Sequence, residues 1–146
     1  MSARSRVAFQ VFRFDPDSDR EPRYDLYEVE VRGGMTVLEG LFEILEKQDP
    51  SLAFRYSCRG AVCGSCAMYI NSQILLACQT QLQDLNAQEV LVAPLPHLPV
   101  LKDLVVDMEP FYHKFEEILP YLMTRSVPER EFLQSPKARK ALDEVT

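Results

Sequence analysis

Two segments near the start of the chain alternate apolar and polar residues, as strands with one buried face do. Residues 7–14 are rich in valine and phenylalanine, and residues 24–31 alternate tyrosine and valine with glutamate. The turn-forming run at residues 15–19 separates them. The pattern predicts an antiparallel hairpin with a loose loop.

The next segment has the period of a helix. Apolar residues recur at i, i+3, i+4 and i+7 and would share one buried face: Leu38, Leu41, Phe42 and Leu45. Thr36 and Glu39 have the spacing of a capping box, which predicts where this helix begins. Asp49-Pro50 predicts its end, because the residue before proline is disfavoured in the α region.

Shorter strand-like runs follow. Residues 67–75 read as a second hairpin around Asn71-Ser72, and residues 89–93 read as a further strand. Strands with one helix packed across them predict a small mixed sheet of α+β class.

The composition changes at the proline-rich run Pro94-Leu95-Pro96-His97-Leu98-Pro99, which predicts a stiff connector. The sequence therefore predicts a first domain over residues 1–99 and a helical segment over residues 100–146. One expected helix carries the apolar stripe Phe111, Phe115, Ile118 and Leu122, and Pro120 should kink or end it. Ser135-Pro136 predicts the start of a last helix through Ala138 and Leu142.

Composition and charge exclude several classes of protein. Apolar residues make up 47% and charged residues 26% of the 146 residues, which is ordinary for a soluble globular protein. The net charge of −6 gives no reason to expect nucleic acid as a partner. No apolar run approaches the ~20 residues that cross a bilayer. The first residues lack the apolar stretch of a secretory signal, so we expect a cytoplasmic protein.

The cysteines change the picture most. All four lie within 21 residues, in the spacing C-x4-C-x2-C-x11-C: Cys58, Cys63, Cys66 and Cys78. Disulfides between cysteines so close in sequence would connect no distant segments of the chain. The cysteines therefore indicate a metal or redox-cofactor site. Zinc ribbons pair two C-x2-C knuckles, and a Rieske centre needs two histidine ligands. His97 and His113 lie far from the cysteines, and we expect them to be structural or solvated. The spacing is that of plant-type [2Fe–2S] proteins.

The loop around the cysteines suits such a cluster. Four thiolates and an Fe₂S₂ core carry about two negative charges when oxidised, and hydrogen bonds to the sulfurs tune the potential. Gly60 and Gly64 would give the backbone freedom to approach the sulfurs. Arg55 and Arg59 would place positive charge nearby and favour the reduced state.

The spacing also suggests how the ligands divide between the two irons. Cys63 and Cys66, two residues apart, suit chelation of one iron. Cys58 and Cys78 would complete the set, Cys78 arriving from the far side of the short hairpin.

Several motifs together resemble the iron–sulfur subunit of succinate dehydrogenase and fumarate reductase. They cover nearly the whole chain, at residues 54–59, 63–68, 76–80, 94–107, 120–122 and 131–136. The resemblance implies a β-grasp, plant-ferredoxin-like domain with a [2Fe–2S] cluster on Cys58, Cys63, Cys66 and Cys78. Arg59, Gly60 and Gly64 would lie in the loop around it.

The resemblance also implies a place in a larger complex. A flavoprotein subunit with FAD would act on succinate or fumarate. Electrons would pass through [2Fe–2S], [4Fe–4S] and [3Fe–4S] clusters to a quinone at a membrane-anchor subunit. This chain would touch the membrane only indirectly, at the inner face of the cell membrane. No catalytic residue for a substrate is expected in it.

The chain departs from the family pattern in two places. The family usually has Arg-Glu-Gly after its first ligand, whereas Arg59-Gly60-Ala61 stands here. Some relatives have aspartate at the position of Cys66, and this chain keeps the thiol. After Thr146 no cysteine-rich second domain follows, so residues 100–146 are interpreted as the start of that domain, and the missing part as a partner.

Other classes of function remain open on the sequence alone. A free [2Fe–2S] ferredoxin-type carrier would be consistent with the negative net charge of the chain, but it would not need the helical segment over residues 100–146. The small iron–sulfur subunit of a molybdenum hydroxylase shares the spacing but carries a second cysteine set and lacks the proline connector. A non-redox scaffold would require metal-free thiols.

Overall fold

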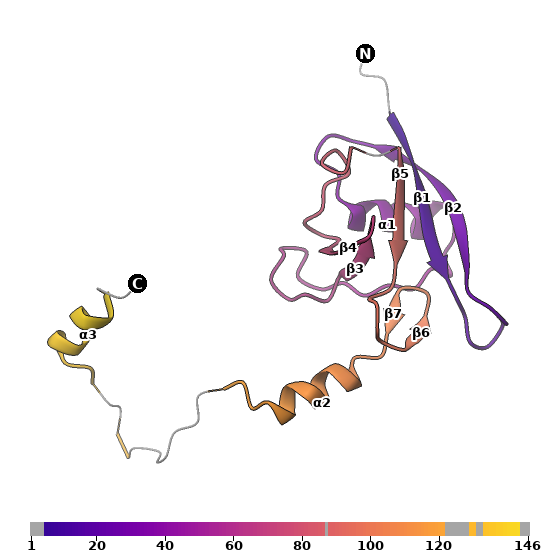
Figure 1. Cartoon of the computed structure of the whole chain (residues 1–146). Coiled ribbons are helices and arrows are strands. Elements are labelled where there is room, and N and C mark those ends of the chain that lie inside the picture. The colour runs from indigo at the N-terminus through magenta and orange to yellow at the C-terminus, as the bar shows by residue number, and fades with distance from the viewer. Residues whose placement is uncertain (1–4, 87, 122–128, 131–132, 144–146) are drawn as a thin grey trace. The chain divides into compact units, whose positions relative to one another are not determined.

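The computed structural model describes residues 5–86, 88–121, 129–130 and 133–143 (Figure 1). Two compact units divide the chain, Met1–Tyr112 and His113–Thr146. The elements are, in order, β1 (Ser5–Arg13), β2 (Arg23–Val31), α1 (Val37–Lys47), β3 (Ala67–Ile70), β4 (Gln73–Leu76), β5 (Glu89–Ala93), β6 (Val100–Lys102), β7 (Val105–Val106), α2 (Glu109–Glu117) and α3 (Pro136–Asp143).

Five strands form one mixed sheet in the order β2-β1-β5-β3-β4. The hairpin β1–β2 is antiparallel, with Phe9 opposite Tyr27, and β5 joins β1 in parallel, with Val11 beside Val92. The antiparallel hairpin β3–β4 completes the sheet through the pairing of β3 with β5. A mixed sheet of this order, crossed by one helix, is the β-grasp, ferredoxin-like arrangement of α+β class that the sequence predicted.

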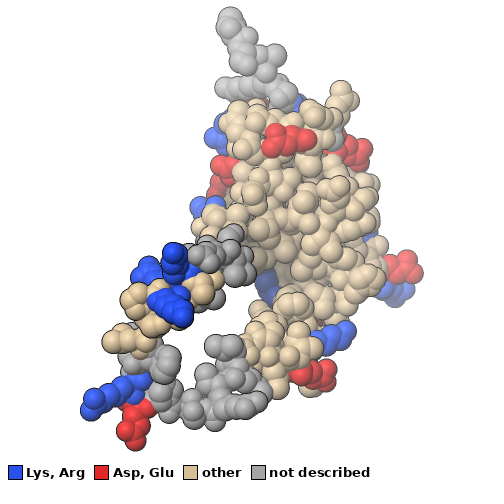
Figure 2. Space-filling model, turned by 60° about the vertical axis from the view of Figure 1, so that its left-hand side comes forward, with Lys and Arg blue, Asp and Glu red and all other residues tan. Residues whose placement is uncertain are grey.

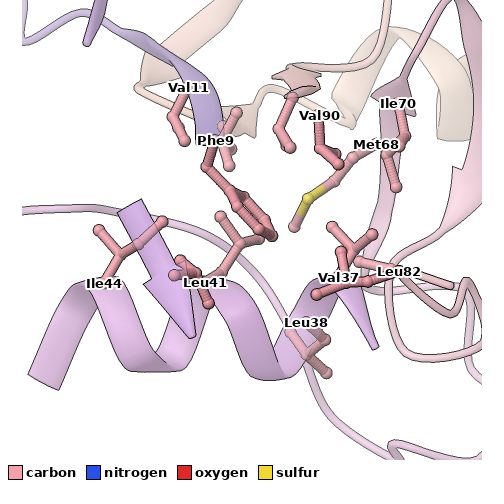
Figure 3. Packing of buried hydrophobic residues seen from close by; sticks show 14 of the residues in the cluster. Phe9, Val11, Val37, Leu38, Leu41, Ile44, Met68, Ile70, Leu82 and Val90 are labelled. Atoms are coloured by element: carbon pink, nitrogen blue, oxygen red, sulfur yellow. The ribbon is translucent and has the colours of Figure 1, made fainter. Parts of the chain in front are cut away.

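The core lies between the sheet and α1 (Figure 3). Phe9 of β1 is fully buried and points towards Leu41 and Ile44 of the helix. The predicted capping box is confirmed: the Glu39 amide donates to the Thr36 hydroxyl at 3.3 Å, and the Glu39 carboxylate accepts from the Thr36 amide at 2.8 Å. The helix therefore begins where the sequence predicted.

A buried ion pair fixes the segment after the proline connector. The Arg13 guanidinium is 4% exposed and donates to the Asp103 carboxylate at 3.0 Å. The same carboxylate accepts from the amides of Phe14 (3.0 Å) and Ala53 (2.9 Å), and the Leu104 amide donates to the Ala53 carbonyl at 3.2 Å. Asp103 thus ties the β6–β7 turn to the end of β1 and to the segment that leads into the cysteines.

The structure differs here from the predicted boundary between residues 1–99 and a helical segment at residues 100–146. Residues 100–106 form the two short strands β6 and β7, and the first compact unit runs to Tyr112. The strands are three and two residues long and depend on Asp103, whose φ is +46°, so periodicity could not reveal them.

Two helices follow. α2 carries Phe111 and Phe115 and ends before Pro120, as the sequence predicted, and none of its residues is buried. The Ala138 amide donates to the Ser135 hydroxyl at 3.2 Å, which confirms Ser135 as the N-cap of α3. Leu122 and residues 131–132 lie outside the described residues. Among the described residues, no helix is long and apolar enough to cross a bilayer.

Candidate iron–sulfur site

The cysteine loop is the irregular segment of residues 53–66 between α1 and β3. Its root is held by the hydrogen bond from the Ala53 amide to Asp103, and its other end runs directly into β3. Residues 55–65 are exposed, whereas Cys66 is 3% exposed. The two ends of the loop are therefore held by the sheet domain, and Cys58 and Cys63 lie at the surface.

Cys58 and Cys63 form one pair. Two backbone amides donate to the Cys58 sulfur, that of Gly60 at 3.4 Å and that of Cys63 at 3.3 Å. The Cys58 amide donates in return to the Cys63 sulfur at 3.5 Å. The loop thus curls around these two sulfurs and directs N–H groups at them.

Cys66 and Cys78 form the other pair, across the base of the β3–β4 hairpin. Ala67 pairs with Leu76, and the Ala77 amide donates to the Cys66 carbonyl at 3.0 Å, so Cys78 follows next to Cys66. Burial and the neighbouring Cys78 thiol raise the pKa of the Cys66 thiol. The Leu38 amide, in the first turn of α1, donates to the Ala77 carbonyl at 3.0 Å and holds this segment on the helix. Cys78 arrives from the far side of the hairpin, as the sequence predicted.

This grouping differs from the predicted chelation of one iron by Cys63 and Cys66. The two residues between them carry the chain from the loop into β3, which sends the Cys66 side chain into the interior. The closeness of Cys58 to Cys63 depends on the curled backbone, which spacing alone does not reveal.

The four thiols are the type and number of donors that a [2Fe–2S] cluster takes. Two thiol pairs are what a [2Fe–2S] cluster requires, because bridging sulfides complete the coordination of each iron. The amides aimed at sulfur are the donors that stabilise such a cluster.

The loop also makes one thiol acidic. Hydrogen bonds from the Ser65 hydroxyl, and then from the amides of Cys58 and Ser65, lower the pKa of Cys63 to about 6. Burial raises the pKa of Cys66, which lies inside. Ser65 was not singled out from the sequence, although a hydroxyl within the C-x2-C segment between Cys63 and Cys66 is a usable signal.

The two glycines of the loop differ in backbone conformation. Gly64 has φ +72°, in the left-handed region that favours glycine. Gly60 does not have a positive φ. Its two neighbours do, with φ +54° at Arg59 and +58° at Ala61. Ala61 therefore holds, with a side chain, a backbone conformation that favours glycine.

Charge is distributed unevenly around the site. Residues 51–83 contain Arg55 and Arg59 and no acidic residue, in a chain of net charge −6. With the side of the sheet domain that carries β3 and β4 turned forward, Figure 2 shows a broad face with its charged side chains at the margins. His97 is exposed in the connector, and the His113 imidazole lies 3.9 Å from the Glu117 carboxylate.

Fold and thiol arrangement together define a small iron–sulfur domain of the ferredoxin type. Residues 8–113 match the model of the 2Fe-2S iron-sulfur cluster binding domain, and the chain belongs to that family. Its cofactor is accordingly a [2Fe–2S] cluster.

Curated relatives and a solved structure agree. The chain is 43% identical over 137 residues to the succinate dehydrogenase iron-sulfur subunit of Paracoccus denitrificans, covering 92% of this chain and 52% of that protein. It is 41% identical over 140 residues to the same subunit of Coxiella burnetii, covering 94% and 59%. A chain of the apo Sdh1 complex of Mycobacterium smegmatis superposes with a TM-score of 0.79 at 29% identity, covering 92% of this chain and 56% of that one. The chain spans about half the length of these relatives.

Proposed function

We propose that this chain is the [2Fe–2S]-bearing part of the electron-transfer subunit of a succinate dehydrogenase or fumarate reductase. The observation that carries the proposal is the arrangement of the four thiols in two pairs, one held by loop amides and the other by the hairpin. The chain that holds them is 43% identical to such a subunit over 92% of this chain. The bound cluster would take up and pass on one electron at a time.

In this proposal the ligands are Cys58 and Cys63 for one iron and Cys66 and Cys78 for the other. The amides of the curled loop would hold the sulfurs of the first pair. The β3–β4 hairpin and the first turn of α1 would hold the second pair in the interior. The residues that surround the cluster contribute position and hydrogen bonds, and no side chain is assigned to act on a substrate.

The partners follow from the same proposal. A flavoprotein subunit with FAD would supply electrons from succinate, or receive them for fumarate. Further clusters of the [4Fe–4S] and [3Fe–4S] types and a membrane-anchor subunit would connect the chain with quinone. The chain would then act at the inner face of the cell membrane through the complex. Cys58 and Cys63 are exposed, in a stretch of sequence (residues 51–83) without acidic residues, which supports close approach of a partner subunit.

Succinate-dependent reduction tests this function. The full chain would be tagged and purified from its source under anaerobic conditions with the proteins that accompany it. We expect covalently bound flavin in that preparation and bleaching of the cluster spectrum by succinate. The chain purified alone should be reduced by dithionite and not by succinate.

Two results would contradict the proposal. Bleaching of the isolated chain by succinate would place substrate chemistry in this chain. The second result has two parts: succinate does not reduce the cluster in a flavin-containing preparation, and the isolated chain exchanges electrons rapidly with a soluble ferredoxin reductase. That result would favour the free carrier.

A further inference from the structure

Arg59 has an unusual place in the cysteine loop. It follows Cys58, and its φ of +54° lies in the left-handed region that residues with a side chain rarely adopt. Its guanidinium carbon lies 4.9 Å from the ring centre of Phe42 and 5.3 Å from that of Tyr56. The backbone of the loop therefore directs this side chain away from the loop tip and onto two aromatic rings.

The aromatic rings are anchored to the core. Phe42 belongs to α1, is half-buried and packs edge-to-face on Tyr56 at 4.7 Å and on Phe54 at 5.4 Å. The same helix turns Leu41 and Ile44 into the core, and Phe42 packs against that core. We call Phe42, Phe54 and Tyr56 the aromatic shelf. A cation stacked on this shelf is held at a set position beside the loop.

The charge of Arg59 is not neutralised locally. Among the described residues no carboxylate forms an ion pair with it, whereas Arg6, Arg13 and Arg23 each have one. Glu39, which lines the same hollow as Arg59, hydrogen-bonds to Thr36 in the capping box. One hollow of about 210 Å³ is lined by Thr36, Leu38, Glu39, Phe42, Arg59 and Cys78. The unpaired cation thus borders the same hollow as one of the four thiols.

We propose that Arg59 is a positioning residue whose stacking on the aromatic shelf both latches the cysteine loop to α1 and sets the reduction potential of the cluster. The proposal rests on the [2Fe–2S] function above. One electron from an external reductant makes the cluster more negative, and Arg59 stays protonated throughout, so no proton moves. A fixed cation without an ion-pair partner stabilises the reduced, more negative cluster. The aromatic shelf sets the distance between the Arg59 guanidinium and the cluster.

Three variants separate the charge from the latch. Arg59→Gln removes the charge, and Arg59→Lys keeps it without the planar group that stacks. Phe42→Leu keeps the arginine and removes one of the rings on which it stacks. Arg6→Gln is the matched control, because it removes one exposed arginine from β1. The midpoint potential of the bound cluster in the full chain would be measured by dye-mediated titration.

The latch predicts an ordered result. Arg59→Gln should shift the reduction equilibrium by about tenfold towards the oxidised state, which is about 59 mV for one electron. Arg59→Lys and Phe42→Leu should shift it in the same direction by less, and Arg6→Gln should leave it unchanged. A potential in Arg59→Gln equal to that of Arg6→Gln would overturn the electrostatic half of the proposal. An unshifted Phe42→Leu would show that the shelf does not position the charge.

A second measurement does not depend on iron. In the iron-free chain, hydrogen exchange at the amides of residues 58–63 should be roughly two- to fivefold faster in Arg59→Gln than in the control, from the loss of the cation–π contacts. Slow exchange in α1 in every variant would show that the fold is kept. Equal loop exchange in Arg59→Gln and Arg6→Gln would refute the latch. A wild-type chain that binds no cluster would instead refute the proposed function.

Discussion

The left-handed residues of the cysteine loop show how individual positions carry the site. Arg59 and Ala61 have positive φ, yet only glycine takes that conformation without a steric cost. The sequence suggested Gly60 and Gly64 as the flexible points, because a glycine is visible in a sequence and a φ angle is not. Spacing alone indicated the four cysteines as candidate ligands, whereas the closeness of Cys58 to Cys63 depends on this backbone.

Ala61→Gly should stabilise the loop. Glycine relieves the left-handed strain of about 1–2 kcal/mol, and the greater freedom of the unfolded chain takes back about 0.4–1 kcal/mol. We expect a net gain of about 0.5–1 kcal/mol in the free energy of unfolding, measured in urea. Ala67→Gly in β3, where φ is not positive, is the control and should destabilise by about 0.5–1 kcal/mol. A loss in both variants would contradict the strain at Ala61.

The buried charges near Arg13 make a prediction about pH. Burial by itself would raise the pKa of Asp49, but hydrogen bonds from Ser51, Tyr27 and Arg13 outweigh it and hold the pKa well below its usual range. A carboxyl whose pKa is lower in the folded chain contributes stability above its unfolded pKa and loses it as the pH falls.

Asp49→Asn should therefore cost about 1.5–3 kcal/mol in the free energy of unfolding at pH 7. The difference from the wild-type chain should shrink as the pH falls below about 4, where the unfolded carboxyl is protonated. Urea unfolding of both chains at pH 7 and pH 3.5 measures this. A difference that is the same at both pH values would mean that the Asp49 charge does not contribute.

At the scale of elements, the packing of α1 on β1 places the tightest demand on a side chain. A Cβ added at Gly40 would overlap the ring of Phe9, whereas one added at Gly33 would meet nothing within 4 Å. Glycine usually weakens a helix by about 1 kcal/mol relative to alanine. At Gly40 that cost is offset by the close approach of helix and sheet.

Gly40→Ala should accordingly destabilise the chain in spite of the better helix propensity of alanine. Overpacking costs about 1–3 kcal/mol, and the propensity returns about 1 kcal/mol. Thermal unfolding should show a lower midpoint for Gly40→Ala and a change within about 0.5 kcal/mol for Gly33→Ala. Adding Phe9→Leu to Gly40→Ala should recover part of the loss. A more stable Gly40→Ala chain would show that the two elements can move apart.

The elements also show where sequence reasoning reaches its limit. The hairpin β1–β2, the capped helix α1 and the N-cap of α3 were predicted because each is encoded by nearby residues. The strands β6 and β7 were not, because their turn is held by Asp103 bonding to Phe14 and Ala53, which lie 89 and 50 residues away. Periodicity reports local structure and is blind to such contacts.

At the scale of the whole chain, the two compact units differ in how much they bury. The first has a continuous core, whereas the described side chains of the second are exposed, among them Ile118 at 72% and Leu133 at 82%. A helix of nine residues is marginal in water without packing. The interpretation of residues 100–146 as the start of a second cluster domain stays a prediction.

Hydrogen exchange on the isolated chain tests it. Exchange should be slow in β1, β5 and α1, and fast in α2 and α3. Raising the protein concentration should slow exchange in the two later helices if self-association covers them. Slow exchange in α2 at every concentration, in a chain that sediments as a monomer, would mean that α2 needs no partner.

The central claim is that four thiols in two pairs hold one [2Fe–2S] cluster, and its composition is the most direct test. Iron and acid-labile sulfide would be measured per chain after anaerobic reconstitution, with zinc measured on the same sample. The account predicts about two irons and about two sulfides per chain, with almost no zinc. One zinc per chain and no sulfide would contradict it.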